Sequence, residues 1–446
     1  MTASHLRDTI FALASGAGRS AIAVIRVSGP KARDMLIALA SKLPPPRAAR
    51  LATLMDDGTG EIIDRGLVLW MPGPGSATGE DTVEFHIHGG SAVIAGLCQA
   101  LARHGGVRPA EAGEFTRRAF ANGRIDLVEA EGLADLLAAE TPMQRRLALG
   151  QMLGEASARY GEWRGRLLRM LAMVEAAIDF SEEDDVARSA LAGLDGEIAC
   201  LADEMAAALE GFAGAREIRG GISIVLAGLP NTGKSSLLNR LAMREAAIVS
   251  SRPGTTRDVI EVRMELGGMA VTVMDTAGLR CSSGDEIEDE GMARTRERAG
   301  AADLLVWVAA PDVEASLAVE PDLSPDLVVL NKCDLAPEGE GARSGEDRIG
   351  VSARTGTGVA EFMALLAEKL RRRYQPAQAA VIVRERHFSA VAESIRMLND
   401  IRLAEKPLEV TAESLRLAGQ ALGRVTGHID VESILDAIFA EFCIGK

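Results

Sequence analysis

The sequence has few cysteines, and they lie far apart. Cys98, Cys200, Cys281, Cys333 and Cys443 form no C-x-x-C pair and have no partnering histidine cluster. Zinc sites and disulfide scaffolds need closer and more regular spacings, so neither is predicted. A reducing compartment fits this cysteine usage best.

Long apolar runs are absent as well. The longest, Leu304 to Ala310, is far shorter than the ~20 residues that a bilayer span requires, and the N-terminus has no apolar stretch typical of a signal peptide. The last four residues match a prenylation box only loosely, because Gly445 and Lys446 replace an aliphatic residue and a permitted final residue. We therefore expect a soluble cytoplasmic protein without membrane attachment.

Positive charge is in deficit. The 49 Lys and Arg against 64 Asp and Glu leave a net charge of −15, which repels phosphate backbones. Non-specific nucleic-acid binding is therefore not expected, and a nucleic-acid partner would need a local basic patch or a helper protein. The 446 residues, 47% of them apolar, are typical of a globular chain with about three domains of ~150 residues each.

Hydrophobic periodicity divides the chain into regions of different class. Residues 1–118 mix short strand-like runs with a helical pattern and predict an α+β domain. Residues 119–216 and 379–446 are helical in pattern, and residues 217–378 alternate strands and helices as in a largely parallel sheet. Because two short helical blocks would bury little separately, we expect the α/β domain to be inserted into one all-α domain.

Individual elements are predicted from alternation and turn residues. N-terminal strands are expected at 21–27, 66–71 and 82–88, with a helix over 91–104. Strands of the α/β region are expected at 222–228, 259–266, 269–275, 303–308 and 326–331. Helix breaks are expected at Pro142, at the acidic residues 182–185 and near Pro407.

Residues 228–235 (GLPNTGKS) match the phosphate-loop pattern G-x-x-x-x-G-K-S between a predicted strand and a predicted helix. Backbone N–H groups would converge on phosphate oxygens, Lys234 would place charge on the outer phosphates, and Ser235 would offer a hydroxyl to Mg²⁺. An ordinary glycine-rich turn is the alternative, which the flanking elements disfavour. The expected nucleotide contacts here are Asn231, Thr232, Gly233, Lys234, Ser235 and Ser236.

Further segments follow in the order that a nucleotide switch requires. Thr255 and Thr256 can supply a second hydroxyl to Mg²⁺, and residues 275–278 end a strand with an acid for the metal shell. The segment Asn331-Lys332-Cys333-Asp334 also ends a strand, and the acceptor-only Asp334 carboxylate matches the paired donors of guanine but not adenine. The ordered set predicts a Ras-like P-loop GTPase. Its remaining expected contacts are Asp275, Thr276, Ala277, Gly278 and, closing the base pocket, Ser352, Ala353 and Arg354.

The group that orients the hydrolytic water is not the one used by Ras-like enzymes. Leu279 stands where those enzymes have glutamine, and leucine cannot orient water. Asn231 could coordinate a monovalent cation beside the β- and γ-phosphates, although it could also simply brace its own loop. A carboxylate in the run 285–290 could hold the water, although such a run is more often a solvated face.

Beyond these segments, the whole chain resembles the bacterial MnmE (TrmE) family of tRNA-modification GTPases. The resemblance rests on outer motifs that a generic GTPase lacks: Asp8-Thr9-Ile10, Arg26-Val27-Ser28-Gly29, Thr78-Gly79-Glu80-Asp81, His88-Gly89-Gly90, residues 113–120 (GEFTRRAF) and residues 442–446 (FCIGK). It implies a tetrahydrofolate-binding and dimerisation domain (1–118), a helical domain in two parts (119–216 and 379–446) and an inserted GTPase domain (217–378).

The resemblance also implies a reaction. Members form a heterotetrameric complex with the flavoprotein MnmG (GidA) and act on certain tRNAs. They add an aminomethyl or carboxymethylaminomethyl group to carbon 5 of the wobble uridine, using formyl- or methylene-tetrahydrofolate. Their hydrolysis of GTP to GDP follows potassium-dependent pairing of two GTPase domains, so a homodimer is expected.

Matching motifs assign roles to single residues. The implied catalytic residues are Glu288, Asn231 and Lys234, with Glu286 an open alternative to Glu288 as the residue that positions water. The implied metal ligands are Ser235 and Thr256 for Mg²⁺, and Asn231, Ser250, Arg252 and Thr255 for K⁺; Ser250 also contacts the nucleotide. The implied folate residues are Arg26, Glu84, Arg124 and Lys446.

The implied residues have the chemistry that a folate requires, and each also has a commoner use. A carboxylate such as Glu84 can accept hydrogen bonds from the aminopyrimidine edge of a pterin, whereas Arg and Lys suit the glutamate tail. Surface salt bridges for Arg26 and Arg124, and a frayed terminus for Lys446, are the commoner uses of such residues. Cys443 has either a functional role or that of a small buried hydrophobe.

One other function would use the same guanine pocket, namely that of a regulatory GTPase that assists ribosome assembly by binding RNA. Such a protein is expected to carry a basic RNA-binding appendage. The N-terminal region of this acidic chain instead carries the pattern Arg26, Glu84 and Arg124. The sequence therefore favours the tRNA-modifying function.

Overall fold

A computed structural model describes most of the chain. The described residues are 8–179, 191–244, 261–275, 300, 302–319, 323–335, 347–375, 380–401, 403, 405–429, 435, 438–440, 442 and 444–445. The chain divides into two compact units. The first unit comprises residues 1–134, 151–192 and 401–446, and the second comprises residues 135–150 and 193–400.

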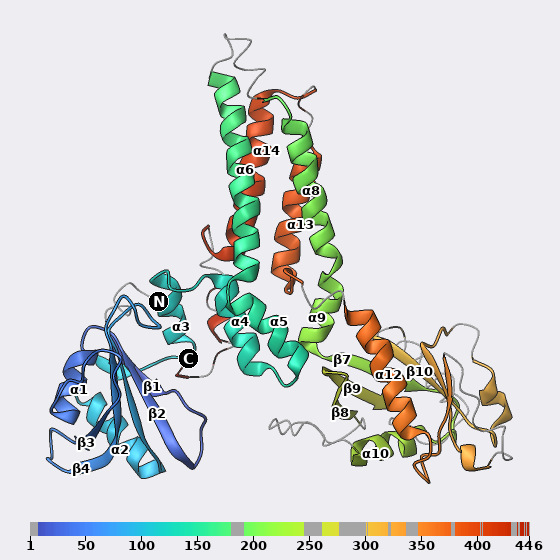
Figure 1. Cartoon of the computed structure of the whole chain (residues 1–446), viewed down its shortest axis with the longest axis horizontal. Helices are drawn as coiled ribbons and strands as arrows, with labels where there is room; N and C mark the ends of the chain where they lie inside the picture. The colour runs from blue at the N-terminus through green and yellow to red at the C-terminus, as the bar shows by residue number, and fades with distance from the viewer. Residues whose placement is uncertain are drawn as a thin grey trace, which may run out of the picture. The chain divides into compact units, whose positions relative to one another are not determined.

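The first unit contains a six-stranded sheet in the order β3-β4-β5-β2-β1-β6 (Figure 1). Its strands are β1 (Thr9–Leu13), β2 (Ser20–Ser28), β3 (Arg50–Met55), β4 (Ile62–Met71), β5 (Thr82–Gly89) and β6 (Val107–Pro109). All neighbours are antiparallel except the parallel pair β1–β6. The expected strands in β2, β4 and β5 are confirmed. The strands β1, β3 and β6 were not predicted, because each is short and lacks a clear alternation.

Helices cover both faces of this sheet. On one face, α1 (Ala32–Ala40) and α2 (Ser91–Ala102) bury Leu36 and Leu97 in a core with Phe11. The next residue toward the N-terminus, Ile10, points to the opposite face, where it packs with Phe115 of α3 (Glu114–Ala121). The α2 helix confirms the prediction for 91–104, apart from its last turn.

Two long helices of the first unit pack along each other. They are α6 (Glu155–Asp179) and α14 (Leu408–Thr426), which run side by side in Figure 1. Trp163 and Leu167 of α6 and Leu415 of α14 are buried. The chain before α6 forms α4 (Leu127–Ala138) and α5 (Pro142–Met152), and residues 135–150 of this stretch belong to the second unit. Pro142 is the first residue of α5, where its missing N–H costs nothing, so the predicted break there is confirmed.

The second unit contains a six-stranded sheet in the order β12-β11-β10-β7-β9-β8. Its strands are β7 (Ile222–Ala227), β8 (Glu261–Leu266), β9 (Met269–Asp275), β10 (Leu304–Ala309), β11 (Leu327–Leu330) and β12 (Arg348–Gly350). Every pair is parallel except β8–β9, which confirms the predicted largely parallel sheet. Apolar residues of β7 and β10, such as Ile224 and Val306, are fully buried.

Helices surround this second sheet. The helices α9 (Phe212–Gly220), α10 (Lys234–Arg244) and α12 (Val359–Tyr374) bury Ile218, Leu237 and Phe362 in one core with the sheet. The helices α8 (Leu194–Glu210) and α13 (Glu385–Asn399) pack on each other. The break near Pro407 is confirmed, since Pro407 caps α14, and the acidic residues 182–185 lie outside the described part of the chain.

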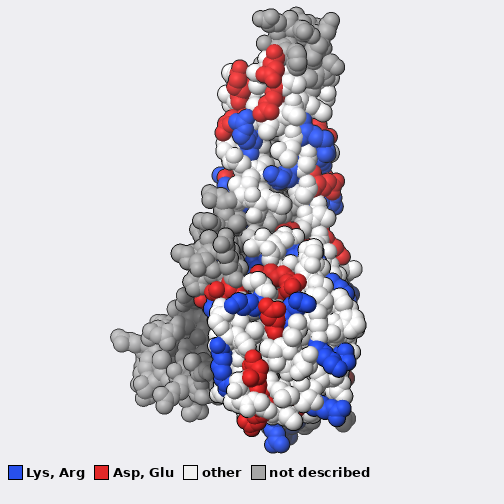
Figure 2. Space-filling view, turned by 90° about the vertical axis from the view of Figure 1, so that its left-hand side faces the viewer, with Lys and Arg blue, Asp and Glu red and all other residues white. Residues whose placement is uncertain are grey.

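The described helices and surface match two features of the composition, the lack of long apolar runs and the mixture of acidic and basic residues. Among the described residues, no helix combines the length and the apolar character needed to cross a bilayer. Figure 2 shows acidic and basic side chains interspersed on one face, with no large region of a single charge sign in the described part of that face.

Candidate functional site

The segments predicted to bind a nucleotide meet at one edge of the second sheet. Residues 228–235 connect β7 to α10, Asp275 is the last residue of β9, and Asn331 directly follows β11. Since β7, β9 and β11 all run in the same direction through the sheet, their carboxyl ends lie at the same edge. The tertiary structure therefore brings together three segments that are far apart in the sequence.

Asn331 connects the phosphate loop to the base segment. Its amide Nδ2 donates to the carbonyl oxygens of Thr232 at 2.8 Å and Gly233 at 3.3 Å. Its Oδ1 accepts from the N–H of Ala353 at 3.1 Å. Gly233 has a φ of 89°, and a Cβ there would lie 2.4 Å from Asn331 Nδ2. Glycine is required at this position for both reasons.

Lys234 is buried inside the phosphate loop. Its ammonium donates to the carbonyl oxygens of Gly228 at 2.8 Å and Leu229 at 2.9 Å. Burial lowers the pKa of Lys234, and the nearby Asp275 carboxylate partly opposes this effect. Thr232, which is also buried, donates its hydroxyl to the same Leu229 carbonyl at 2.9 Å, whereas Ser236 is exposed on the first turn of α10.

Ser235 and Asp275, near Lys234, supply a pair of oxygen atoms of the kind that bind metal ions. The Ser235 hydroxyl donates to Asp275 Oδ2, and the Asp275 side chain is fully buried. Hydroxyl and carboxylate oxygens are the ligands that Mg²⁺ prefers. The residues present therefore fit the predicted metal.

The base side of the site is organised around Asp334. Ser352 donates its hydroxyl to Asp334 Oδ1 at 2.6 Å, and Arg354 pairs with Oδ2 at 3.1 Å. The Ser352 hydrogen bond lowers the pKa of Asp334 more than burial raises it, and Arg354 and Lys332 add to the lowering. The carboxylate is therefore an acceptor at neutral pH, as guanine recognition requires.

Lys332 of the segment 331–334 contacts the phosphate loop. Its ammonium donates to the Asn231 carbonyl at 2.7 Å and to Asp312 at 2.6 Å. Asn231 has a φ of 64°, which places it in the left-handed region, and it is exposed. The backbone carbonyl of Asn231 is thus held by Lys332, and the residue is exposed.

The predicted folate residues lie in the first unit. Arg26 of β2 and Glu84 of β5 are cross-strand partners whose side chains pair through Arg26 Nε and Glu84 Oε1 at 3.0 Å. Glu84 also contacts His86 at 3.2 Å, and the Arg26 guanidinium lies 5.9 Å from the Phe115 ring centroid. Arg124 is exposed after α3 and packs near Gly79. The structure thus pairs Arg26 with Glu84 and shows no contact of either with Arg124.

Comparison with known proteins decides the family. The profile of the MnmE helical domain matches residues 127–443, and that of the GTP-binding protein TrmE N-terminus matches residues 9–124. A protein named tRNA modification GTPase MnmE in Methylobacterium sp. (strain 4-46) is 50% identical over 99% of this chain and 100% of its own length. Equally named proteins are 49% identical in Parvibaculum lavamentivorans (98% of this chain, 100% of the relative) and 48% identical in Azorhizobium caulinodans (98% and 99%).

The chain belongs to the MnmE family. The predicted resemblance is therefore confirmed, and so is the predicted multidomain fold class with a P-loop domain. Members of the MnmE family are named as GTPases that act in tRNA modification.

Several predicted MnmE site residues lie outside the described part of the chain. They are Ser250, Arg252, Thr255, Thr256, Thr276, Ala277, Gly278, Glu288 with its alternative Glu286, and Lys446. Leu279 and Cys443 lie outside it as well.

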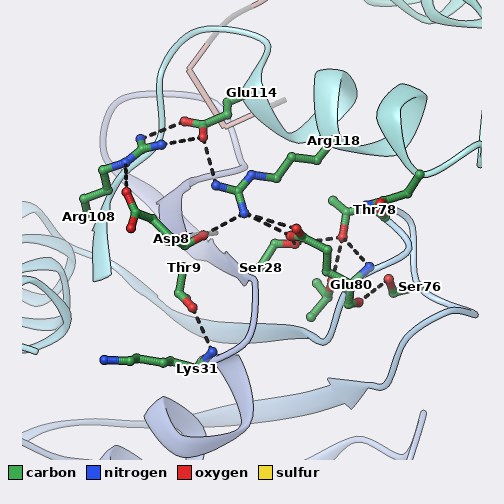
Figure 3. Close-up of polar contacts among 12 residues, drawn as sticks. Asp8, Thr9, Ser28, Lys31, Ser76, Thr78, Glu80, Arg108, Glu114 and Arg118 are labelled. Atoms are coloured by element: carbon green, nitrogen blue, oxygen red, sulfur yellow. Dashed lines mark hydrogen bonds and ion pairs between the residues drawn. The ribbon is translucent and has the colours of Figure 1, made fainter. Parts of the chain in front are cut away.

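A buried ionic network in the first unit had no predicted role (Figure 3). Arg118 of α3, which is fully buried, pairs with Glu114 at 3.0 Å and with Glu80 at 3.1 Å, and it donates to the Asp8 carbonyl at 2.7 Å. Arg108 also pairs with Glu114, at 2.7 Å. The MnmE motifs 78–81 and 113–120 therefore meet through their charges.

The loop before β5 is part of the same network. Glu80 accepts from Ser28 at 2.8 Å, and Ser28 in turn contacts Thr78 at 2.7 Å. Burial opposes ionisation of Glu114, but hydrogen bonds from Arg108, the Glu111 backbone and Arg118 outweigh it and lower the pKa of Glu114. The Glu114–Arg118 spacing of four residues on a short helix was the one sequence signal for this pairing.

Proposed function

We propose that this protein hydrolyses GTP as one component of a tRNA-modifying complex. The complex adds a carboxymethylaminomethyl or aminomethyl group to carbon 5 of the wobble uridine. The observation that carries the GTPase part is the meeting of residues 228–235, Asp275, 331–334 and 352–354 at one sheet edge. Membership of the MnmE family supports the tRNA part.

Different residues at this sheet edge bind different parts of the nucleotide. Lys234 and the loop N–H groups bind the phosphates, and Ser235 with Asp275 and Thr256 holds Mg²⁺, which neutralises charge on the phosphate oxygens. Asp334 accepts from the two donors of guanine, and Ser352 keeps that carboxylate in place.

We propose that hydrolysis requires potassium and two paired copies of the chain. Asn231, Ser250, Arg252 and Thr255 would hold the ion, and Glu288 would position the water. The support is the exposed Asn231 side chain on a backbone fixed by Lys332.

The test is GTP turnover in matched potassium and sodium salts at several protein concentrations. Turnover per chain should rise with concentration in potassium and stay low in sodium. Equal turnover in both salts would contradict the role of Asn231. Glu288→Ala should keep GTP binding and lose hydrolysis, whereas loss of binding with normal turnover would contradict its role.

We further propose a folate site on the first sheet. Glu84 would accept from the pterin, and Arg26, Arg124 and Lys446 would bind the glutamate tail. The support is that Arg26 and Glu84 are adjacent on one sheet face, with Glu84 only partly buried.

Calorimetry with formyl-tetrahydrofolate tests the folate site. Glu84→Gln should weaken binding strongly, and Asp64→Asn, which removes a carboxylate bonded to His88 on the same sheet, should not. Equal affinity of the wild type and Glu84→Gln would contradict the site.

The remaining assignments follow the family. We propose a homodimer that binds the flavoprotein MnmG and tRNA in the cytoplasm. We propose the domain limits 1–118, 119–216 with 379–446, and 217–378. The matches of the TrmE N-terminus to residues 9–124 and of the MnmE helical domain to residues 127–443 support the first of these boundaries, between the N-terminal and helical regions.

A further inference from the structure

Arg240 of α10 is a charged residue to which no role has been assigned above. Its guanidinium reaches from the helix that begins at Lys234 to the loop that follows β12. Nε donates to the Ala353 carbonyl at 2.8 Å, and Nη2 donates to the Arg354 carbonyl. Hydrogen bonds from an ionised donor are roughly twice as strong as neutral ones. Arg240 therefore holds two consecutive peptide groups of the base loop.

The same loop is held from its other side by Asn331. The N–H of Ala353 donates to Asn331 Oδ1 at 3.1 Å. Within the loop, the N–H of Gly356 donates to the Ser352 carbonyl at 2.8 Å, which closes a tight turn. Both the N–H and the carbonyl of Ala353 are thus fixed, one by a residue that follows β11 and the other by α10.

The position of this loop determines the position of Asp334. Ser352 and Arg354 bind one carboxylate oxygen each, and both residues belong to the loop that Arg240 holds. We propose that Arg240 is a positioning residue for base selection, which fixes the loop and thereby keeps the Asp334 carboxylate in the plane that guanine requires. This inference rests on the proposed reading of guanine by Asp334.

A role of Arg240 in base selection predicts a change in selectivity between nucleotides. A guanidinium that merely stabilises α10 would affect all nucleotides alike. If Arg240 acts through Asp334, its loss should lower the affinity for GDP more than that for IDP, because hypoxanthine lacks the 2-amino group and offers the carboxylate one donor instead of two. Phosphate binding should change little, since the hydrogen bonds that join the loop 228–235 to Asn331 and Lys332 do not involve Arg240.

The experiment measures affinities of the full-length chain for GDP, IDP and inorganic pyrophosphate with Mg²⁺ present. Arg240→Ala should lower the preference for GDP over IDP about tenfold, mainly through faster GDP dissociation, and leave pyrophosphate affinity unchanged. Arg240→Lys, which cannot hold both carbonyls, should fall between wild type and Arg240→Ala. Arg263→Ala, at an exposed position of β8, is the matched control and should change none of the three affinities.

The outcomes separate this inference from the proposed function. A wild type that prefers GDP, together with an Arg240→Ala variant that keeps the full preference, would overturn the role of Arg240 alone. Equal loss of GDP, IDP and pyrophosphate affinity would also overturn it. A wild type that does not prefer GDP over IDP would contradict the recognition of guanine by Asp334. It would then also contradict the positioning role of Arg240. Should Arg240→Ala fail to fold, the preference measured on Arg240→Lys decides.

Discussion

At the scale of single residues, the neighbours of Asp334 keep its carboxyl group ionised. Its pKa is lowered by the Ser352 hydroxyl first, and then by charges on Arg354 and Lys332. An ionised carboxylate offers only acceptors, so its preference for a base with two donors does not change across the neutral pH range.

We expect Asp334→Asn to shift the preference from GTP toward xanthosine triphosphate, because the new amide donates where xanthine carries an oxygen. Hydrolysis rates with both nucleotides measure this shift. Asp347→Asn, at a largely exposed carboxylate that pairs with Lys369, is the control. Unchanged preference for GTP in Asp334→Asn would contradict the assignment.

Replacement of the buried Arg118 should lower stability strongly. Arg118→Met would leave the buried Glu114 with Arg108 as its arginine partner. It would also remove the ion pair between Glu80 and α3. Removing one partner of a buried ion pair costs about 3–5 kcal/mol. Urea unfolding should show this loss, whereas Arg159→Ala, which breaks an exposed pair with Glu162, should cost less than about 1 kcal/mol.

The same network predicts a dependence of stability on pH. The pKa of Glu114 in the folded chain is lowered below its ordinary value of 4.5. A lowered pKa means that the stabilisation is fully present above pH 4.5 and is lost as the pH falls toward the folded value. The free energy of unfolding should therefore fall more steeply below this pH in the wild type than in Glu114→Gln. Parallel curves for the two would contradict this assignment.

At the scale of elements, α9 is anchored on the chain segments around it. Arg219 near its end pairs with Asp135 at 3.0 Å, and Arg384, just before α13, pairs with the same carboxylate at 2.9 Å. Tyr374 at the end of α12 donates to Glu217 of α9, and burial together with this bond raises the pKa of the phenol. Because α9 leads directly into β7, these contacts help to fix the strand that carries the phosphate loop.

The start of α3 also depends on a single residue. Gly113 caps the helix with a φ of 68°, and a Cβ there would lie 2.4 Å from the Phe439 carbonyl oxygen. Gly113→Ala should therefore destabilise the chain by about 2–4 kcal/mol, from backbone strain and from displacement of Phe439. Gly123→Ala, with a φ of 64° but open space around its Cβ, should cost only about 1 kcal/mol. Equal losses of unfolding free energy would show that the Phe439 contact is unimportant.

The elements of the second sheet were well predicted from the sequence, and those of the first were predicted in part. Strands such as β7 and β10 are buried on both faces, so their continuous apolar runs are distinctive. The edge strand β3 carries exposed Leu51 and buried Leu54 without regular alternation, and its pairing with β4 is decided by long-range contacts. The local sequence pattern therefore does not predict such a strand.

At the scale of the whole molecule, the helical region is divided between the two compact units. The helices α6 and α14 belong to the first unit, and α8 and α13 belong to the second. The candidate nucleotide residues lie only in the second unit, and the described folate residues lie only in the first. Each ligand should therefore stabilise one unit.

We expect calorimetry to resolve two unfolding transitions. GDP with Mg²⁺ at about 100 times its dissociation constant should stabilise the second unit by about 2.7 kcal/mol and raise only its transition. Formyl-tetrahydrofolate should raise the other transition, and Arg118→Met should lower that one alone. A single transition that responds to both ligands would show that the units unfold together.

The chemistry of the nucleotide site follows from the amino-acid sequence alone. The phosphate loop, the Asp275 segment and the Asn331–Asp334 segment are local patterns whose chemistry depends on residue type and spacing. The family likewise follows from motifs along the whole chain, as its relatives confirm. Which distant groups Arg118 and Arg240 contact depends instead on the folded chain. Arg118 reaches Glu80 across a separation of 38 residues, and Arg240 reaches Ala353 across a separation of 113. Contacts of this kind leave no periodic signal in the sequence, because the fold and not the local chain brings the partners together.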